Sequence, residues 1–128
     1  ATARSINNYK AEWCEQKVEN AILRFNLDKG RKPVVAFMGM AFKPDIDDLR
    51  ESPAKNIIKS TIDNCDKADY LIVEPNISTH PEYELTAYDE AYRRADIVVF
   101  LTAHTPFKSL QWDDNKIILD FCGIFKRN

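Results

Sequence analysis

The stretch VVAFMG at residues 34–39 predicts the fold most directly, because it is a short, continuous apolar run that stops at a glycine. Such a run suits a strand that is buried on both faces, as in a parallel sheet. Three more runs of similar length follow it in the chain: YLIV at 70–73, IVVFL at 97–101 and IIL at 117–119. We therefore expect four buried strands.

Helical segments are predicted between these runs. Ser52 and Pro53 indicate a helix start, because serine caps free N–H groups and proline fits the first helical turn. Thr86 and Asp89 resemble the capping box of a second helix. Thr105, which precedes a proline, indicates a short helical turn. Strands that alternate with helices predict an α/β fold, a Rossmann-like three-layer domain with a mostly parallel sheet.

A helix at the start of the chain stands apart from this alternation. Residues 5–26 carry apolar side chains at spacings of three and four, which places them on one helical face. Gly30 and Pro33 then interrupt the pattern. No strand precedes this segment, and we expect it to be a connecting helix from a preceding region.

Composition narrows the class of protein. The 128 residues are 45% hydrophobic and 30% charged, which is typical of one soluble globular domain. The net charge is −2, so neither a basic face nor a nucleic-acid partner is expected. No apolar run approaches the roughly 20 residues of a membrane helix. The three cysteines form no CxxC pair, so no disulfide framework or metal site is expected, and a reducing cytoplasm is the simplest location.

Ligands of open parallel sheets bind beyond the carboxyl ends of the strands, here residues 39–51, 102–105 and 120–125. The first of these loops has one glycine, so it is neither a dinucleotide fingerprint nor a P-loop. Anion contacts would have to come from side chains, for which Lys43 and Arg50 are the candidates. The alternative is that these charges only solvate the loop and pair with its own acids: Asp45, Asp47, Asp48 and Glu51.

Histidines and cysteines give weaker signals. His104 follows the third strand, where it could contact a substrate, transfer a proton or cap the next turn. Cys122 follows the fourth strand, but nothing near it in sequence supplies a base, so we expect it to pack. Cys14 and Cys65 are expected in the core, and His80 in an exposed loop.

The first loop resembles a known family. GMAFKPD at 39–45 and DDLRESPA at 47–54 closely resemble the C-terminal domain signature of the UDP-glucose/GDP-mannose dehydrogenase family. EPN at 74–76 also matches this signature, and the sequences of these motifs are most similar to the UDP-N-acetyl-D-mannosamine branch of the family. The start of the chain resembles the end of the family's central helical domain. The resemblance thus implies a helix of that domain over 1–30 and a UDP-sugar-binding domain over 31–128.

The resemblance also implies an activity. Members of the family oxidise a sugar C6 alcohol to a carboxylate in two NAD-dependent steps, and their nucleophilic cysteine lies in a glycine-rich motif. Neither that motif nor the NAD fingerprint occurs here, so we expect no catalytic residue and no turnover from this chain alone. Phe42 and Lys43 would contact the UDP-sugar, and Arg50 would reach NAD, which is bound mainly by an N-terminal domain. The resemblance also implies the partners of this chain, which are the N-terminal and central domains and further copies of the enzyme. It implies a role for the parent enzyme in polysaccharide synthesis.

One departure from the family pattern concerns the sugar. A basic residue usually follows the aspartate that ends the last strand, whereas Cys122 lies near that place here. Either Lys126 or Arg127 substitutes, or the contact is missing. UDP-glucose and GDP-mannose dehydrogenases remain alternatives, as does a non-catalytic α/β interaction module whose loops pack against a partner domain.

Overall fold

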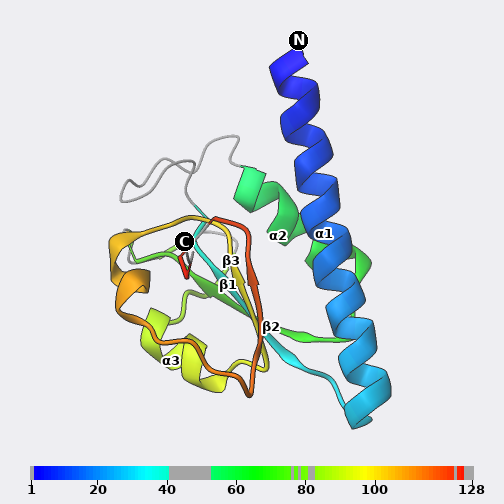
Figure 1. Ribbon diagram of the computed structural model, residues 1–128, viewed down its shortest axis with the longest axis vertical. Coiled ribbons are helices and arrows are strands. Elements are labelled where there is room, and N and C mark those ends of the chain that lie inside the picture. The colour runs from blue at the N-terminus through cyan, green and yellow to red at the C-terminus, as the bar shows by residue number, and fades with distance from the viewer. Residues whose placement is uncertain are drawn as a thin grey trace.

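The computed structural model describes residues 2–40, 53–75, 77, 79–80, 83–122 and 124–125. Within these ranges helices alternate with strands as the apolar runs predict (Figure 1). The elements are α1 Thr2–Lys29, β1 Val34–Met38, α2 Pro53–Asn64, β2 Asp69–Val73, α3 Tyr88–Arg94, β3 Ile97–Phe100, the 3-10 helix η1 Thr105–Ser109 and β4 Ile117–Asp120.

The four strands form one sheet in the order β2-β1-β3-β4. All three pairings are parallel, so the sheet is parallel throughout its described strands and not only mostly so. Ala36 in β1 pairs with Leu71 of β2 on one side and with Val98 of β3 on the other. The chain leaves β1 toward β2 and later returns to β3 on the opposite side. The strand order therefore reverses between β1 and β3, which is where such sheets bind ligands.

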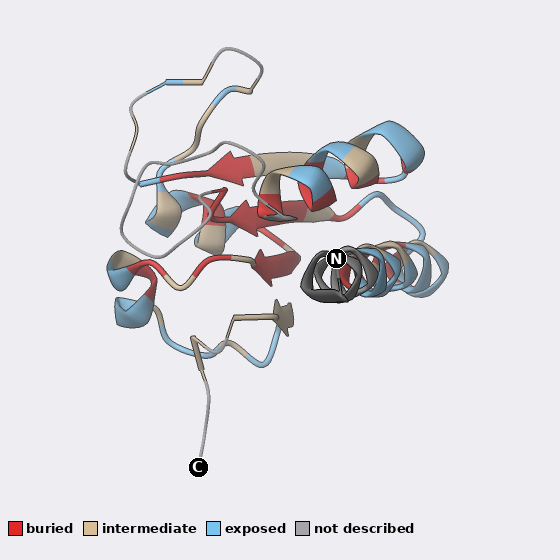
Figure 2. Ribbon diagram, turned by 90° about the horizontal axis from the view of Figure 1, so that it is seen from above, coloured by how far each residue is buried: buried red, intermediate tan, exposed pale blue. Residues whose placement is uncertain are grey.

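Alternate residues of each strand point to opposite faces, and each face has its own core. Phe37 and Val99 pack with α1 and α2 on one side, whereas Met38 and Phe100 pack with α3 and η1 on the other. Figure 2 shows the buried central strands between helices whose outer surfaces are exposed, whereas β4, predicted to be buried, is only half-buried. The predicted three-layer α/β architecture is confirmed.

Helix α1 extends a few residues beyond the predicted range of 5–26 at both ends. Cys14, Val18, Ile22 and Phe25 are buried at spacings of three and four, which confirms the predicted apolar face. The helix ends where Gly30 adopts a positive φ of 68° and donates its N–H to the carbonyl of Asn26 at 2.9 Å. In Figure 1 the N-terminal part of α1 extends past the rest of the domain.

The helix-start predictions succeed for α2 and fail for α3. Helix α2 begins at Pro53 as predicted, although Ser52 lies outside the described residues. The predicted capping box of Thr86 and Asp89 is wrong, because α3 begins at Tyr88 and its N-cap residue, Ala87, makes no side-chain capping hydrogen bond. Thr86 instead donates its N–H to the carbonyl of Ile72 at 2.8 Å, so its backbone follows the edge of the sheet.

Candidate functional site

Three strand ends meet at the switch point, and backbone hydrogen bonds hold them together. Gly39, which follows β1, donates its N–H to the carbonyl of Val73 in β2 at 2.9 Å. On the other side, Leu101 donates to the carbonyl of Met38 at 3.0 Å. The chain that leaves the central strand therefore starts from a fixed position at the ligand-binding edge of the sheet.

Gly39 is required at this position for two reasons. Its φ of 101° lies in a region that L side chains rarely adopt. In addition, a Cβ atom on Gly39 would lie 2.8 Å from the Cβ of Thr102, which follows β3. Any side chain here would push the ends of β1 and β3 apart.

A buried carboxylate occupies the same edge. Glu74 directly follows β2, and its side chain is fully buried. Its Oε1 accepts a hydrogen bond from the N–H of Met40 at 2.8 Å, and His104 Nε2 lies 3.1 Å from both of its carboxylate oxygens. A carboxylate can be buried only when such donors replace its water. The three residues therefore form one polar cluster between the three strand ends.

His104 belongs to the core of the site. Its ring is fully buried and packs edge-on against Phe107, with ring centroids 5.5 Å apart. It occupies the N-cap position of η1, but its side chain makes no capping hydrogen bond. Of the three roles considered for His104, capping of the next turn by its side chain is therefore wrong, because the ring is directed to Glu74 instead.

Sequence reasoning did not identify Glu74 as a site residue. One signal was available, since an acid that directly follows a buried strand lies at the ligand edge of a parallel sheet. Its partner, His104, is 30 residues away in the sequence, and no spacing rule connects the two.

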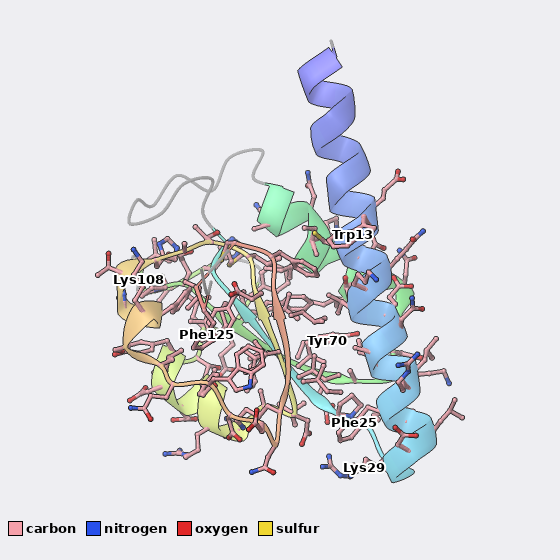
Figure 3. The ribbon with its side chains drawn as sticks, viewed as in Figure 1. Trp13, Phe25, Lys29, Tyr70, Lys108 and Phe125 are labelled. Atoms are coloured by element: carbon pink, nitrogen blue, oxygen red, sulfur yellow. The ribbon has the colours of Figure 1, made fainter. Side chains whose placement is uncertain are left out.

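The end of β4 forms a second polar turn. Asp120 accepts hydrogen bonds from the N–H groups of Ile124 and Phe125, at 2.9 and 2.8 Å. Burial, and secondarily the charge of Asp120, raise the pKa of the Cys122 thiol to about 12. The thiol is therefore protonated at neutral pH and a poor nucleophile, which favours its predicted packing role. Phe125 packs edge-on against Phe100 and Trp112, with ring centroids 5.4 Å apart in each pair (Figure 3).

The remaining histidine and cysteine predictions have mixed outcomes. Cys14 and Cys65 are buried as predicted, although Cys65 follows α2 and does not lie within it. Close by, Tyr70 packs between the sheet and α1 and donates its hydroxyl to the carbonyl of Cys65 at 2.7 Å (Figure 3). His80 is half-buried and not exposed, because its ring stacks on Tyr83 at a centroid distance of 5.3 Å.

The residues predicted to contact ligands lie outside the described part of the chain. These are Phe42, Lys43 and Arg50, together with the possible substitutes Lys126 and Arg127. Met40, the last described residue before the loop, is two residues from Phe42 in the sequence and is held by Glu74. The roles of the five residues stay predictions.

Two further properties concern the described residues alone. No three histidine, cysteine or acidic side chains among them are grouped so as to hold a metal ion. In the same part of the chain, no helix combines the length and the apolar character needed to cross a membrane.

Known proteins resemble this chain in sequence and in structure. An NDP-N-acetyl-D-galactosaminuronic acid dehydrogenase from Ralstonia solanacearum is 36% identical over 130 residues, covering 97% of this chain and 29% of that protein. A UDP-N-acetyl-D-mannosamine dehydrogenase from Escherichia coli is 35% identical, covering 98% of this chain and 32% of that protein. A UDP-N-acetyl-mannosamine dehydrogenase structure from S. aureus shares the fold, with a TM-score of 0.73, 20% identity, and coverage of 97% of this chain and 34% of that one.

These similarities decide the family. The chain spans about 30% of the length of the curated relatives named above. The family model for the UDP binding domain of the UDP-glucose/GDP-mannose dehydrogenases matches residues 36–127, which begin in β1 and include the switch-point cluster. The chain therefore belongs to the UDP-glucose/GDP-mannose dehydrogenase family and contains its UDP binding domain.

Proposed function

We propose that this chain is the UDP-sugar-binding domain of an NAD-dependent nucleotide-sugar 6-dehydrogenase. The parent enzyme would oxidise the C6 alcohol of UDP-N-acetyl-D-mannosamine to the carboxylate of UDP-N-acetyl-D-mannosaminuronate. One observation carries the proposal: the family motif begins at Gly39, which lies at the carboxyl end of the central strand beside the topological switch. The 35% identity with the UDP-N-acetyl-D-mannosamine dehydrogenase of E. coli supports this choice of sugar.

The motif supplies the chemistry that UDP requires. Lys43 offers an ammonium group with three donors for phosphate or sugar oxygens, and Phe42 offers an apolar surface beside it. The described residues at the switch point add no exposed cation, since His104 is fully buried. We therefore assign the main anion contact to Lys43, and the contact with NAD to Arg50.

The described strand ends do not fit NAD itself. A Rossmann pyrophosphate site needs glycines where the backbone approaches the phosphates, and here Gly39 is packed against Thr102. When bound, NAD accepts the hydrides removed from the sugar. We assign its main site, and the nucleophilic cysteine, to parts of the parent enzyme outside these residues.

The same proposal divides the chain between α1 and β1, after residue 30. Residues 1–30 would be the last helix of a central helical domain, and residues 31–128 the UDP-sugar-binding domain. The 28-residue length of α1, whose side chains from Cys14 to Phe25 pack on the sheet, supports this division (Figure 1). We also propose that the parent enzyme is a cytoplasmic homo-oligomer that serves polysaccharide synthesis.

Calorimetric titration with UDP, UDP-N-acetylmannosamine and GDP-mannose tests the proposal. We expect the two uridine nucleotides to bind, and Lys43→Ala to weaken both by about tenfold, since a charge-assisted hydrogen bond is lost. Lys59→Ala is the matched control, because Lys59 is an exposed lysine on α2 paired with Asp63 at 3.6 Å. Absence of UDP binding would contradict the proposal, and preference for GDP-mannose would move the chain to another branch of the family.

An assay for NADH completes this test. The chain, mixed with NAD and UDP-sugars, should produce none, because we assign the nucleophile to the rest of the parent enzyme. Measurable turnover would show that assignment to be wrong.

A further inference from the structure

The buried Glu74–His104 pair has no role in the function proposed above. Glu74 follows β2, and His104 follows β3, yet these strands are not neighbours, since β1 lies between them. The pair therefore crosses the sheet just beyond the carboxyl end of β1. At this position Glu74 Oε1 accepts a hydrogen bond from the N–H of Met40 at 2.8 Å.

This arrangement has a steric consequence for any ligand. The space directly beyond a central strand is where parallel sheets commonly place a bound phosphate. In this chain the side chain of Glu74 fills that space, and Gly39 is packed closely against Thr102 beside it. A ligand at this edge must therefore bind beside this space, and the proposed function assigns its contacts to the chain that continues after Met40.

The arrangement also has an energetic consequence. Glu74 and His104 are both fully buried, so their hydrogen bonds act in a medium of low dielectric constant and are costly to lose. Met40 is itself fully buried. Its backbone is therefore held in place from both sides, by Gly39 within the chain and by Glu74 from a neighbouring strand end.

We propose that Glu74 and His104 are positioning residues for nucleotide binding, which set the position of Met40 and thus the point from which the chain continues toward Phe42 and Lys43. The proposal rests on the proposed function, because it assigns UDP contacts to the segment that follows Met40. Neither residue needs to touch the nucleotide.

The test compares Glu74→Ala with Glu74→Gln in the 128-residue chain. Glutamine keeps an oxygen that can accept the Met40 N–H, whereas alanine removes it. We expect Glu74→Ala to weaken UDP binding by about tenfold and to accelerate hydrogen exchange of the Met40 amide, whereas Glu74→Gln stays within about threefold of the native affinity.

Asp96→Ala is the matched control. Asp96 also accepts a backbone N–H of the β1 region, that of Val34 at 2.9 Å, and pairs with a cation, but it lies at the opposite end of the strand. The Asp96→Ala variant should be less stable in urea but should bind UDP with unchanged affinity. This difference separates positioning of the loop from general destabilisation of the domain.

The outcomes are distinguishable. If the native chain binds UDP and Glu74→Ala binds it as tightly as Asp96→Ala does, the positioning role is wrong. An unchanged exchange rate at Met40 would contradict the tether itself. A native chain that does not bind UDP contradicts the proposed function, and the inference with it. If Glu74→Ala fails to fold, His104→Phe replaces it in the test, because phenylalanine keeps the packing against Phe107. His104→Phe should weaken UDP binding more than Glu74→Gln does. Equal UDP affinities of these two variants would overturn the proposal.

Discussion

The two ends of β1 are held in similar ways but in different surroundings. Before the strand, Asp96 accepts the N–H of Val34 and pairs with Arg31 through two hydrogen bonds of 3.0 and 3.1 Å. After it, Glu74 accepts the N–H of Met40 and contacts His104. The first acid is 24% exposed and its arginine 57%, whereas the second pair is fully buried.

The difference supports the proposal that the Glu74 end of the sheet has a function beyond stability. An exposed ion pair is screened by water and salt and contributes little to folding. A buried acid that is paired with a histidine costs desolvation and is tolerated only with well-placed donors. The chain has this costly arrangement at the carboxyl end of β1, where we propose that it sets the position of Met40.

Glycine substitutions should give the largest contrast between the two ends. Gly39→Ala should lower the free energy of unfolding by about 3 kcal/mol, because its Cβ would meet Thr102 and its φ is positive. Gly30→Ala at the opposite end has a φ of 68° but no atom within 4 Å of the new Cβ, so about 1 kcal/mol is expected. Urea unfolding of both variants checks this, and equal losses would show that the close contact is unimportant.

Removal of the two acids should give the next largest contrast. Glu74→Ala leaves the buried N–H of Met40 without its acceptor and should cost about 2–3 kcal/mol. Asp96→Ala should cost about 0.5–1 kcal/mol, since water can replace the partly exposed carboxylate. Urea unfolding at pH 7 measures both losses of unfolding free energy, and a larger loss for Asp96→Ala would contradict the comparison.

The pH dependence of Asp96 should give the smallest effect. Its hydrogen bond from Arg31, and that from the Val34 N–H, hold the pKa of Asp96 below its usual value. A lowered pKa in the folded state adds stability at neutral pH, and this is lost as the pH falls below about 4. Asp96→Asn should therefore lose about 0.5 kcal/mol at pH 7 and less at pH 2, after allowance for screening. Unfolding in urea at both pH values measures the difference, and an equal loss at both would contradict it.

Local sequence patterns were sufficient for the elements and for their class. The central strands β1 and β3 are continuous apolar runs because they are covered on both faces, whereas β4 is only half-buried. Helix α1 shows its buried face through Val18, Ile22 and neighbours at helical spacing. Where tertiary contacts overrode local preference, prediction failed. Thr86 has a good capping side chain, but its backbone is bound to Ile72, and α3 starts two residues later.

The sequence by itself determined that this is a parallel α/β domain, and the motif at 39–54 indicated the family. These features are encoded by residues close together in the chain. Only the tertiary structure decided that Glu74 and His104 meet beyond the end of β1, because their contact depends on the strand order β2-β1-β3. Burial then makes their pairing energetically important, and burial follows from how the layers pack and not from any local spacing of residues.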